Sequence, residues 1–276
     1  MIDLLPSFDV ALVLRVGGDV LYSHGDLDRV FPLASVTKPI VAWSVLVAVD
    51  RGLTTLDAPA GPPGSTVRHL LSHASGLPFE GRRPAAAPGK RRIYSNEGFD
   101  VLGQLLEDVT GMEIDRWVKQ VIFDPLGMAS ARIPGSPAHA GVASAADLSL
   151  FGAELARPTL VSEPLAALAA MSQFPALAGV VPGYGRFTPC PWGLGVEIRG
   201  EKAPHWSAPD ASARTIGHFG QAGSFVWADR DLAASACFVG EEPFGRWHRE
   251  NWSSLNASLL ETVRSCSSVG VAGGEG

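Results

Sequence analysis

The segment 34–50, ASVTKPIVAWSVLVAVD, decides the fold. It predicts a helix that begins near Ser35, and because apolar residues occupy every face, the helix should be buried at the centre of the protein. Pro39 is compatible with this prediction, since the N–H groups of a helix's first turn have no intrahelical partner. Lys38 needs another explanation, because a buried ammonium is costly unless it is paired or neutralised.

Ser35 and Lys38 together suggest that explanation. Residues three apart on a helix share a face, and a serine at the amino-terminal end lies in the positive field of the helix dipole. A desolvated lysine is driven toward its neutral amine, which can take a proton from the serine or polarise another base that does. The spacing S-x-x-K alone is a weak signal, since it arises by chance in about one such chain in three or four.

Composition excludes several classes of protein. The chain has 276 residues and a net charge of −6, so we expect no binding to nucleic acid or to an anionic membrane. Cys190, Cys237 and Cys266 are an odd number with no C-x-x-C spacing, which favours neither a disulfide framework nor a zinc site. We expect no metal and no cofactor.

The amino terminus, MIDLLPSFDV, has no basic segment of the secretory type, and we expect a cytoplasmic protein. The longest apolar run, from Pro39 to Val49, is too short to span a bilayer, which needs about 20 residues. We expect no membrane association.

Strand patterns occur at both ends of the chain. Residues 9–16 and 19–24 read as a hairpin around Gly17-Gly18, and further strands are expected in 192–200, 214–220, 223–229 and 232–240. A closing helix is predicted over 248–265, with a frayed tail over 268–276. Between the strands, Pro- and Gly-rich loops separate helical patches at 96–111, 115–127 and 144–156.

These patterns predict an α/β (α+β) protein with one antiparallel sheet built from both chain ends and a mostly helical lobe inserted into it. The expected sheet domain is 1–58 plus 192–276 and the expected helical domain is 59–191, with the active site in the cleft between them.

Two further motifs extend the S-x-x-K pattern. Tyr94-Ser-Asn96 precedes an amphipathic helix, and GHFGQAG (residues 217–223) lies in an expected strand. With ASVTK and the intervening segments LLSHASGLP, IFDPLGM and GVASAADLSLFG in order, the chain resembles the serine β-lactamase and penicillin-binding protein fold, in the branch of class C β-lactamases, DD-peptidases and family VIII esterases.

The resemblance implies a role for each motif residue. Ser35 would be the nucleophile that forms an acyl-enzyme, and Lys38 would keep the proton network poised. Tyr94 would be the general base and acid, as a phenolate or proton shuttle, with its pKa lowered by the nearby cation. Asn96 would hydrogen-bond the acyl side of the substrate. Without the resemblance, a core tyrosine and a helix N-cap would be the preferred interpretations of Tyr94 and Asn96.

The third motif would form the other wall of the site. His218, Phe219 and Gly220 are expected to bind substrate, and the backbone N–H groups of Ser35 and Gln221 to form the oxyanion hole. Many relatives carry a hydroxyl residue at the position of Phe219, where it helps to hold a substrate carboxylate. Phenylalanine cannot donate that hydrogen bond, which favours a less polar ester.

The leading expectation is therefore a serine hydrolase, most simply a carboxylesterase on small esters with weak β-lactam hydrolysis. The alternatives are a β-lactamase or DD-peptidase, and a non-hydrolytic ligand-binding or sensor homologue. The substrate would be a small-molecule ester or amide, and the oligomeric state is not predicted.

The sequence also contains several weaker signals. No G-x-S-x-G occurs, which argues against an α/β-hydrolase. His139-Ala-Gly141 also fits H-x-G but precedes an expected helix, and His69 and His73 are more simply structural than zinc ligands. The basic residues at 82–83 and 90–92 suggest either cations at the cleft mouth that attract anionic acyl groups or, more simply, a solvated loop.

Overall fold

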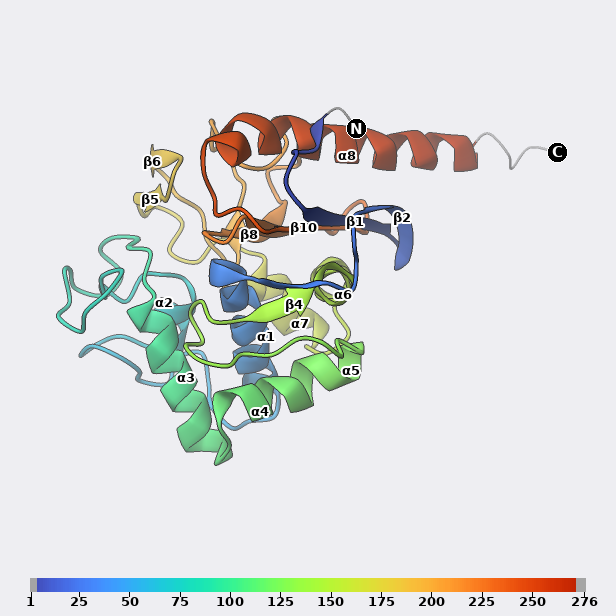
Figure 1. The fold of residues 1–276 in the computed structure, drawn as a ribbon. Helices are drawn as coiled ribbons and strands as arrows, with labels where there is room; N and C mark the ends of the chain where they lie inside the picture. Colours follow the sequence, from blue (N-terminus) through green and yellow to red (C-terminus); the bar gives the residue numbers. More distant parts are fainter. Residues whose placement is uncertain (1–3, 272–276) are drawn as a thin grey trace.

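The computed structural model describes residues 4–271, and side chains for residues 4–266. Its centre is an antiparallel sheet of six strands in the order β2-β1-β10-β9-β8-β7 (Figure 1). The bounds are β1 Val10–Val16, β2 Asp19–His24, β7 Glu197–Ile198, β8 Ile216–Gly220, β9 Ser224–Asp229 and β10 Ala234–Gly240. β1 pairs with β10, so the two ends of the chain meet at the middle of the sheet. The predicted fold class is confirmed.

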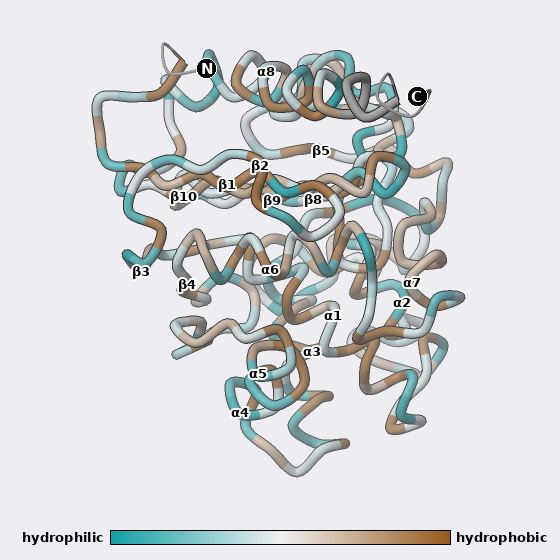
Figure 2. Tube along the Cα trace, turned by 90° about the vertical axis from the view of Figure 1, so that its right-hand side faces the viewer, coloured by the Kyte–Doolittle hydropathy of each residue, from teal (hydrophilic) through white to brown (hydrophobic). Residues whose placement is uncertain are grey.

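Alternation along the strands creates two hydrophobic cores, one on each face of the sheet. On β1, Leu12 and Leu14 belong to one core, whereas Ala11 and Val13 belong to the other. Figure 2 shows the apolar strands as a layer between α8 on one side and α6 and α1 on the other.

The first face of the sheet is covered by α8 (Arg246–Val271), which contributes Trp252, Leu255 and Leu259 to the core. The helix extends beyond the predicted end. The prediction of a frayed tail from residue 268 is wrong for 268–271, which continue α8, and residues 272–276 lie outside the described part of the chain.

The second face is covered by α6 (Ala145–Ala156), with α1 (Thr37–Asp50) beneath it. As predicted, α1 is buried on all sides from Thr37 to Ala48. The chain enters α1 through a short 3₁₀ turn, η2 (Ala34–Val36), which also contacts β8. The first motif therefore lies directly beside the strand that carries the third.

The remaining helices are α2 Val67–Leu71, α3 Glu97–Thr110, α4 Ile114–Val118, the π-helical turn η3 Lys119–Phe123, α5 Asp124–Leu126 and α7 Glu163–Ala169. Of these, α3, α4 and η3 contact α1. Two short antiparallel pairs, β3 Val30–Pro32 with β4 Val142–Ser144 and β5 Gly179–Val181 with β6 Gly185–Phe187, lie outside the main sheet. The domain limits remain a prediction. Helix α6, which comes from the middle of the chain, packs on the sheet. Over residues 4–271, no helix is both long and apolar enough to cross a membrane.

Candidate active site

Ser35 is held in an unusual backbone turn. The residue before it, Ala34, has a φ angle of +44°, a left-handed conformation that costs a non-glycine residue roughly 1–2 kcal/mol. Thr37 stabilises this turn, since its hydroxyl donates to the Ala34 carbonyl at 2.7 Å and accepts from the Gly141 N–H at 2.8 Å. Strain of this kind persists where the surrounding structure imposes it, and it clusters at functional sites.

Lys38 is fully buried, and its amine points at Ser35. The Lys38 Nζ atom lies 3.3 Å from Ser35 Oγ, 2.6 Å from Asn96 Oδ1 and 2.9 Å from the Ala138 carbonyl oxygen. Burial lowers the pKa of Lys38 to about 7. A neutral amine within hydrogen-bond reach of a serine hydroxyl is therefore well populated at neutral pH.

Tyr94 lies against the same amine, but its protonation differs from the expectation. The Lys38 Nζ atom is 4.7 Å from the centre of the Tyr94 ring. Burial nevertheless raises the pKa of Tyr94 well above its ordinary value, and a hydrogen bond with Ser35 offsets only part of that effect. The expected lowering of this pKa is therefore wrong, because desolvation of the buried phenolate is the largest effect on it. Tyr94 is a neutral phenol at neutral pH.

His218 of β8 is a hydrogen-bond acceptor for Tyr94. His218 Nδ1 lies 2.7 Å from the Phe219 carbonyl oxygen, which can only accept, so Nδ1 carries the proton. The Nε2 atom is then free to accept from the Tyr94 hydroxyl at 3.4 Å. Burial lowers the pKa of His218 to about 4, so the ring is neutral at neutral pH.

Asn96 does not cap α3 through its side chain, although it occupies the N-cap position. Ser95 supplies that contact instead, because its hydroxyl accepts from the Gly98 N–H at 2.9 Å. The Asn96 amide oxygen accepts from Lys38 at 2.6 Å. That contact engages the amide oxygen alone, and the expected contact between Asn96 and substrate stays a prediction.

The end of β8 lies against the Ser35 turn. A methyl group added at Gly220 would lie 2.3 Å from the Leu33 carbonyl oxygen and 3.1 Å from the Ser35 nitrogen. This close approach requires a glycine. It places the backbone of Gln221, which follows Gly220, next to the backbone of Ser35.

Ser35, Tyr94, His218, Phe219 and Gln221 line one pocket of about 130 Å³. The rest of its wall is mainly apolar: Phe79, Val181, Pro182 and Trp192.

Glu197 of β7 is the charged side chain on that wall among the described residues, and the sequence analysis did not identify it. Its carboxylate contacts Lys202 at 3.1 Å, His205 at 3.1 Å and Trp206 at 2.8 Å. Burial alone would raise the pKa of Glu197, but the Lys202 ammonium and His205 hold it well below its usual range. The carboxylate is thus fully paired within the protein.

The basic segment does not reach this pocket. Arg82 is exposed and pairs with Glu97 at 3.3 Å, and Arg83, Lys90 and Arg91 are at the surface. Their proposed attraction of anionic substrates at the Ser35 pocket is not supported, since none of them lines its wall.

Arg92 differs from its neighbours, because it is buried and joins three segments of the chain. Its guanidinium donates to the carbonyls of Ser72, Gln173 and Phe174, and to that of Cys190 at 2.7 Å. A buried cation satisfied by several carbonyls holds a loop together, and here it supports the segment that leads into Tyr94.

We expect Arg92→Leu to lower the free energy of unfolding by on the order of 3 kcal/mol, because several buried carbonyls lose their donor. Thermal and urea unfolding measure this loss. Arg91→Leu, at the exposed neighbouring position, is the matched control and should change stability by less than about 0.5 kcal/mol. Equal effects of the two substitutions would contradict the assignment.

The competing histidines lie elsewhere. His139 is exposed and outside the Ser35 pocket. His69 Nδ1 pairs with the Thr66 hydroxyl at 2.9 Å, and His73 Nδ1 accepts from the Ser95 N–H at 3.1 Å. His73 packs beneath Tyr94, with ring centres 4.6 Å apart. No group of three or more metal-ligating side chains is found among the described residues.

Thr37, the Ala138 carbonyl and Trp192 also shape the site, and the sequence analysis did not identify them. Thr37 lies inside the first motif, so its position offered a signal. The Ala138 carbonyl comes from a loop with no regular pattern. Trp192 begins the strand expected over 192–200, of which only Glu197–Ile198 form β7, and only the tertiary fold brings both groups to the site.

Comparison with known proteins gives this arrangement a family. A family model described as Beta-lactamase matches residues 8–240. Esterase EstB of Burkholderia gladioli is 34% identical over 178 residues, covering 43% of this chain and 45% of that protein. The D-alanyl-D-alanine-carboxypeptidase/endopeptidase AmpH of Escherichia coli K12 is 28% identical over 148 residues, covering 40% and 38% respectively. The chain thus spans less than half the length of these curated relatives.

A solved structure matches over nearly its whole length. A crystal structure described as a β-lactamase from Mycobacterium bovis is 44% identical, with a TM-score of 0.91, and the match covers 92% of this chain and 95% of that one. The resemblance expected from the three motifs is confirmed, and the chain belongs to the β-lactamase family.

Proposed function

We propose that the protein is a serine hydrolase that works through an acyl-enzyme on Ser35 and prefers small, uncharged carboxylic esters. The observation that carries this proposal is the buried Lys38 amine, 3.3 Å from Ser35 Oγ, at a pocket with a mainly apolar wall. The proposed roles of the remaining residues follow from the contacts around these two atoms.

In the acylation step, the neutral Lys38 amine accepts the proton of Ser35 as Oγ attacks the ester carbonyl carbon. The backbone N–H groups of Ser35 and Gln221 are the proposed donors to the developing oxyanion, since Gly220 brings the two backbones together. The tetrahedral intermediate then collapses, and the bond to the alcohol oxygen breaks.

The leaving alcohol needs a proton. The Lys38 ammonium carries the proton taken from Ser35. The neutral Tyr94 hydroxyl, which is hydrogen-bonded to Ser35, is the proposed relay of a proton from Lys38 to the alcohol oxygen. His218 orients this hydroxyl through Nε2. In deacylation, water attacks the acyl carbon and gives a proton to Lys38. The bond between the acyl carbon and Ser35 Oγ then breaks as Lys38 returns that proton to Oγ, which restores the serine hydroxyl and releases the acid.

The pocket wall supports the choice of substrate. Phe219 occupies the position where a hydroxyl would bind a carboxylate, and it packs against Tyr184 and Phe244, with ring centres 5.6 and 5.0 Å away. Arginine and lysine are absent from the described lining of this pocket. A charged acyl group would therefore lose its hydration without gaining a partner.

One observation favours a second candidate, β-lactam hydrolysis. The Mycobacterium bovis structure described as a β-lactamase is 44% identical to this chain over 92% of its length. The acylation chemistry proposed here applies equally to a strained amide, so the two functions differ in how the pocket holds the rest of the substrate.

Steady-state kinetics with p-nitrophenyl acetate, a chromogenic cephalosporin and a D-Ala-D-Ala peptide separates these functions, with Ser35→Ala as the control. We expect the ester to have the highest kcat/KM and Ser35→Ala to abolish its turnover. A higher kcat/KM for the cephalosporin would favour the second candidate. Stable acylation without turnover would identify a sensor.

The pH dependence of ester hydrolysis should follow the titration of Lys38. Because the neutral amine is the base and the pKa of Lys38 is about 7, kcat/KM should fall as pH drops below 7, approaching tenfold per unit, and level off at higher pH. His218, with a pKa of about 4, contributes nothing in this range. A profile that stays flat between pH 5 and 8 would contradict the role of Lys38.

A further inference from the structure

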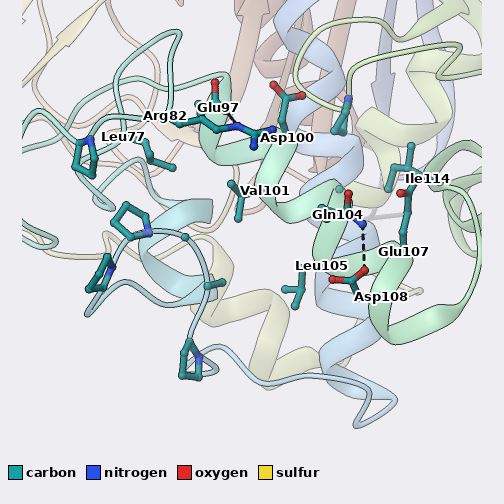
Figure 3. A pocket seen from close by; sticks show the side chains of 18 of the residues that line it. Leu77, Arg82, Glu97, Asp100, Val101, Gln104, Leu105, Glu107, Asp108 and Ile114 are labelled. Atoms are coloured by element: carbon teal, nitrogen blue, oxygen red, sulfur yellow. Dashed lines mark hydrogen bonds and ion pairs between the residues drawn. The ribbon is translucent and has the colours of Figure 1, made fainter.

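Asp100 lies outside the Ser35 pocket yet is connected to its lysine. It projects from the first turns of α3 into a separate groove of about 880 Å³, which Figure 3 shows together with Glu97, Val101 and Asp108 from the same helix. Neither the three motifs nor the proposed mechanism uses this side chain.

A chain of hydrogen bonds leads from Asp100 to Lys38. The Ser136 hydroxyl donates to Asp100 Oδ1 at 2.6 Å, and the Ala138 N–H donates to the same hydroxyl at 3.1 Å. The Ala138 carbonyl oxygen in turn accepts from Lys38 Nζ at 2.9 Å. Each link has one donor and one acceptor, so the chain is complete.

Asp100 also ties together the two acceptors that hold the lysine. Asn96, at the start of α3, accepts from Lys38 through its amide oxygen. Ala138 accepts from Lys38 in the loop that runs past α3. The contact between Asp100 and Ser136 joins that loop to α3, so it sets the separation of the two acceptors.

We propose that Asp100 is a positioning residue for Lys38: through Ser136, its carboxylate holds the Ala138 carbonyl against the lysine amine. The inference rests on the proposed function, in which Lys38 is the base. A misplacement of a reacting group by about 1 Å can cost roughly 100-fold in rate. Loss of the contacts that hold the Lys38 amine should therefore lower kcat.

The charge of Asp100 gives a second, separable effect. The titratable groups around the lysine are His73, Tyr94, Asp100 and His218, and Glu197 acts on the two histidines and the tyrosine. Burial keeps both histidines and the tyrosine uncharged near neutral pH, and Glu197 is neutralised by Lys202. Burial lowers the pKa of Lys38, and the Asp100 carboxylate partly opposes that shift.

Three variants separate position from charge. Asp100→Asn keeps an oxygen that accepts from Ser136 but removes the charge, whereas Asp100→Ala and Ser136→Ala break the chain. Asp108→Asn is the matched control, since Asp108 is another acid of α3 in the same groove and pairs with Gln104 instead.

We expect Asp100→Ala and Ser136→Ala each to lower the plateau kcat by about 10-fold with little change in KM. The double variant should lose little more than either single one, because both break the same chain. Asp100→Asn should keep the plateau rate within about 2-fold, as a conservative replacement that restores position. The acid limb of the pH–rate profile of Asp100→Asn should move to lower pH. Asp108→Asn should change neither the plateau kcat nor the position of the acid limb.

A ¹³C NMR titration of lysine side chains reads the same effect without substrate. The chain has four lysines, and the Lys38 signal is assigned by its loss in Lys38→Met. In Asp100→Asn the Lys38 titration should move to lower pH, and in Asp108→Asn it should not.

These readouts distinguish the two proposals. If wild-type protein turns over no ester, the proposed function fails, whereas the Lys38 titration still tests the effect of Asp100. An unmoved titration in Asp100→Asn would overturn the effect of the Asp100 charge, whereas a wild-type plateau rate in Asp100→Ala, or additive losses in the double variant, would overturn the positioning role.

Discussion

Replacing Lys38 by alanine is expected to lower kcat/KM for small esters by about 10²- to 10⁴-fold, the loss typical of removing a general base. The reason is geometric, since the Lys38 amine, the proposed base, lies 3.3 Å from Ser35 Oγ and has a pKa lowered by burial to about 7. Tyr94 cannot take over, because burial raises its pKa and keeps the phenol protonated. The remaining rate should reflect binding and oxyanion stabilisation alone.

Lys90→Ala, which removes an exposed lysine in the loop before Tyr94, is the matched control and should retain full activity. Propylamine in the assay should partly restore turnover to Lys38→Ala, because the substitution leaves room for a small amine next to Ser35. Circular dichroism establishes that the variant folds. A folded Lys38→Ala protein with activity within 10-fold of wild type would exclude the lysine as the base.

Gly220→Ala is expected to lower kcat by roughly 100-fold, comparable to the loss of one oxyanion-hole donor. The added methyl would lie 2.3 Å from the Leu33 carbonyl oxygen and 2.7 Å from Ser224 Oγ, so β8 must move away from the Ser35 turn. That movement separates the backbones of Ser35 and Gln221. The variant should still form the acyl-enzyme, but slowly, as measured by pre-steady-state release of p-nitrophenol.

Gly245→Ala is a suitable control, since a methyl group there meets its nearest atom, the Pro243 carbonyl oxygen, at an ordinary 3.5 Å. It should leave kcat unchanged. If Gly220→Ala were as active as Gly245→Ala, the strand edge would have no part in binding the oxyanion.

The sheet and its central helix could be predicted from the sequence because both depend on local patterns. Residues 10–16 alternate between two cores, and α1 is apolar on all faces, so each element carries its own signature. Strand patterns at both chain ends predicted a sheet that joins them, and the structure adds that β1 pairs with β10. The extension of α8 to Val271 was missed, because Gly270 weakens the helical pattern there.

The electrostatics of the site could not be predicted in the same way. The pKa of Tyr94 depends on burial by His73, Phe79 and Trp192, which come from separate segments of the chain. Likewise, no spacing shows that Asn96 faces Lys38 or that Glu197 is paired. The motif indicated which residue types meet, and the tertiary structure determines their protonation. The cytoplasmic location and the domain limits remain predictions.

Intact-mass analysis followed by peptide mapping, on protein quenched in acid milliseconds after mixing with p-nitrophenyl acetate, examines the central claim most directly. The account predicts one added acetyl group, on the peptide containing Ser35, that appears in wild type, is absent from Ser35→Ala, and forms far more slowly in Lys38→Ala. An acetyl group on any other side chain, with turnover intact in Ser35→Ala, would contradict it.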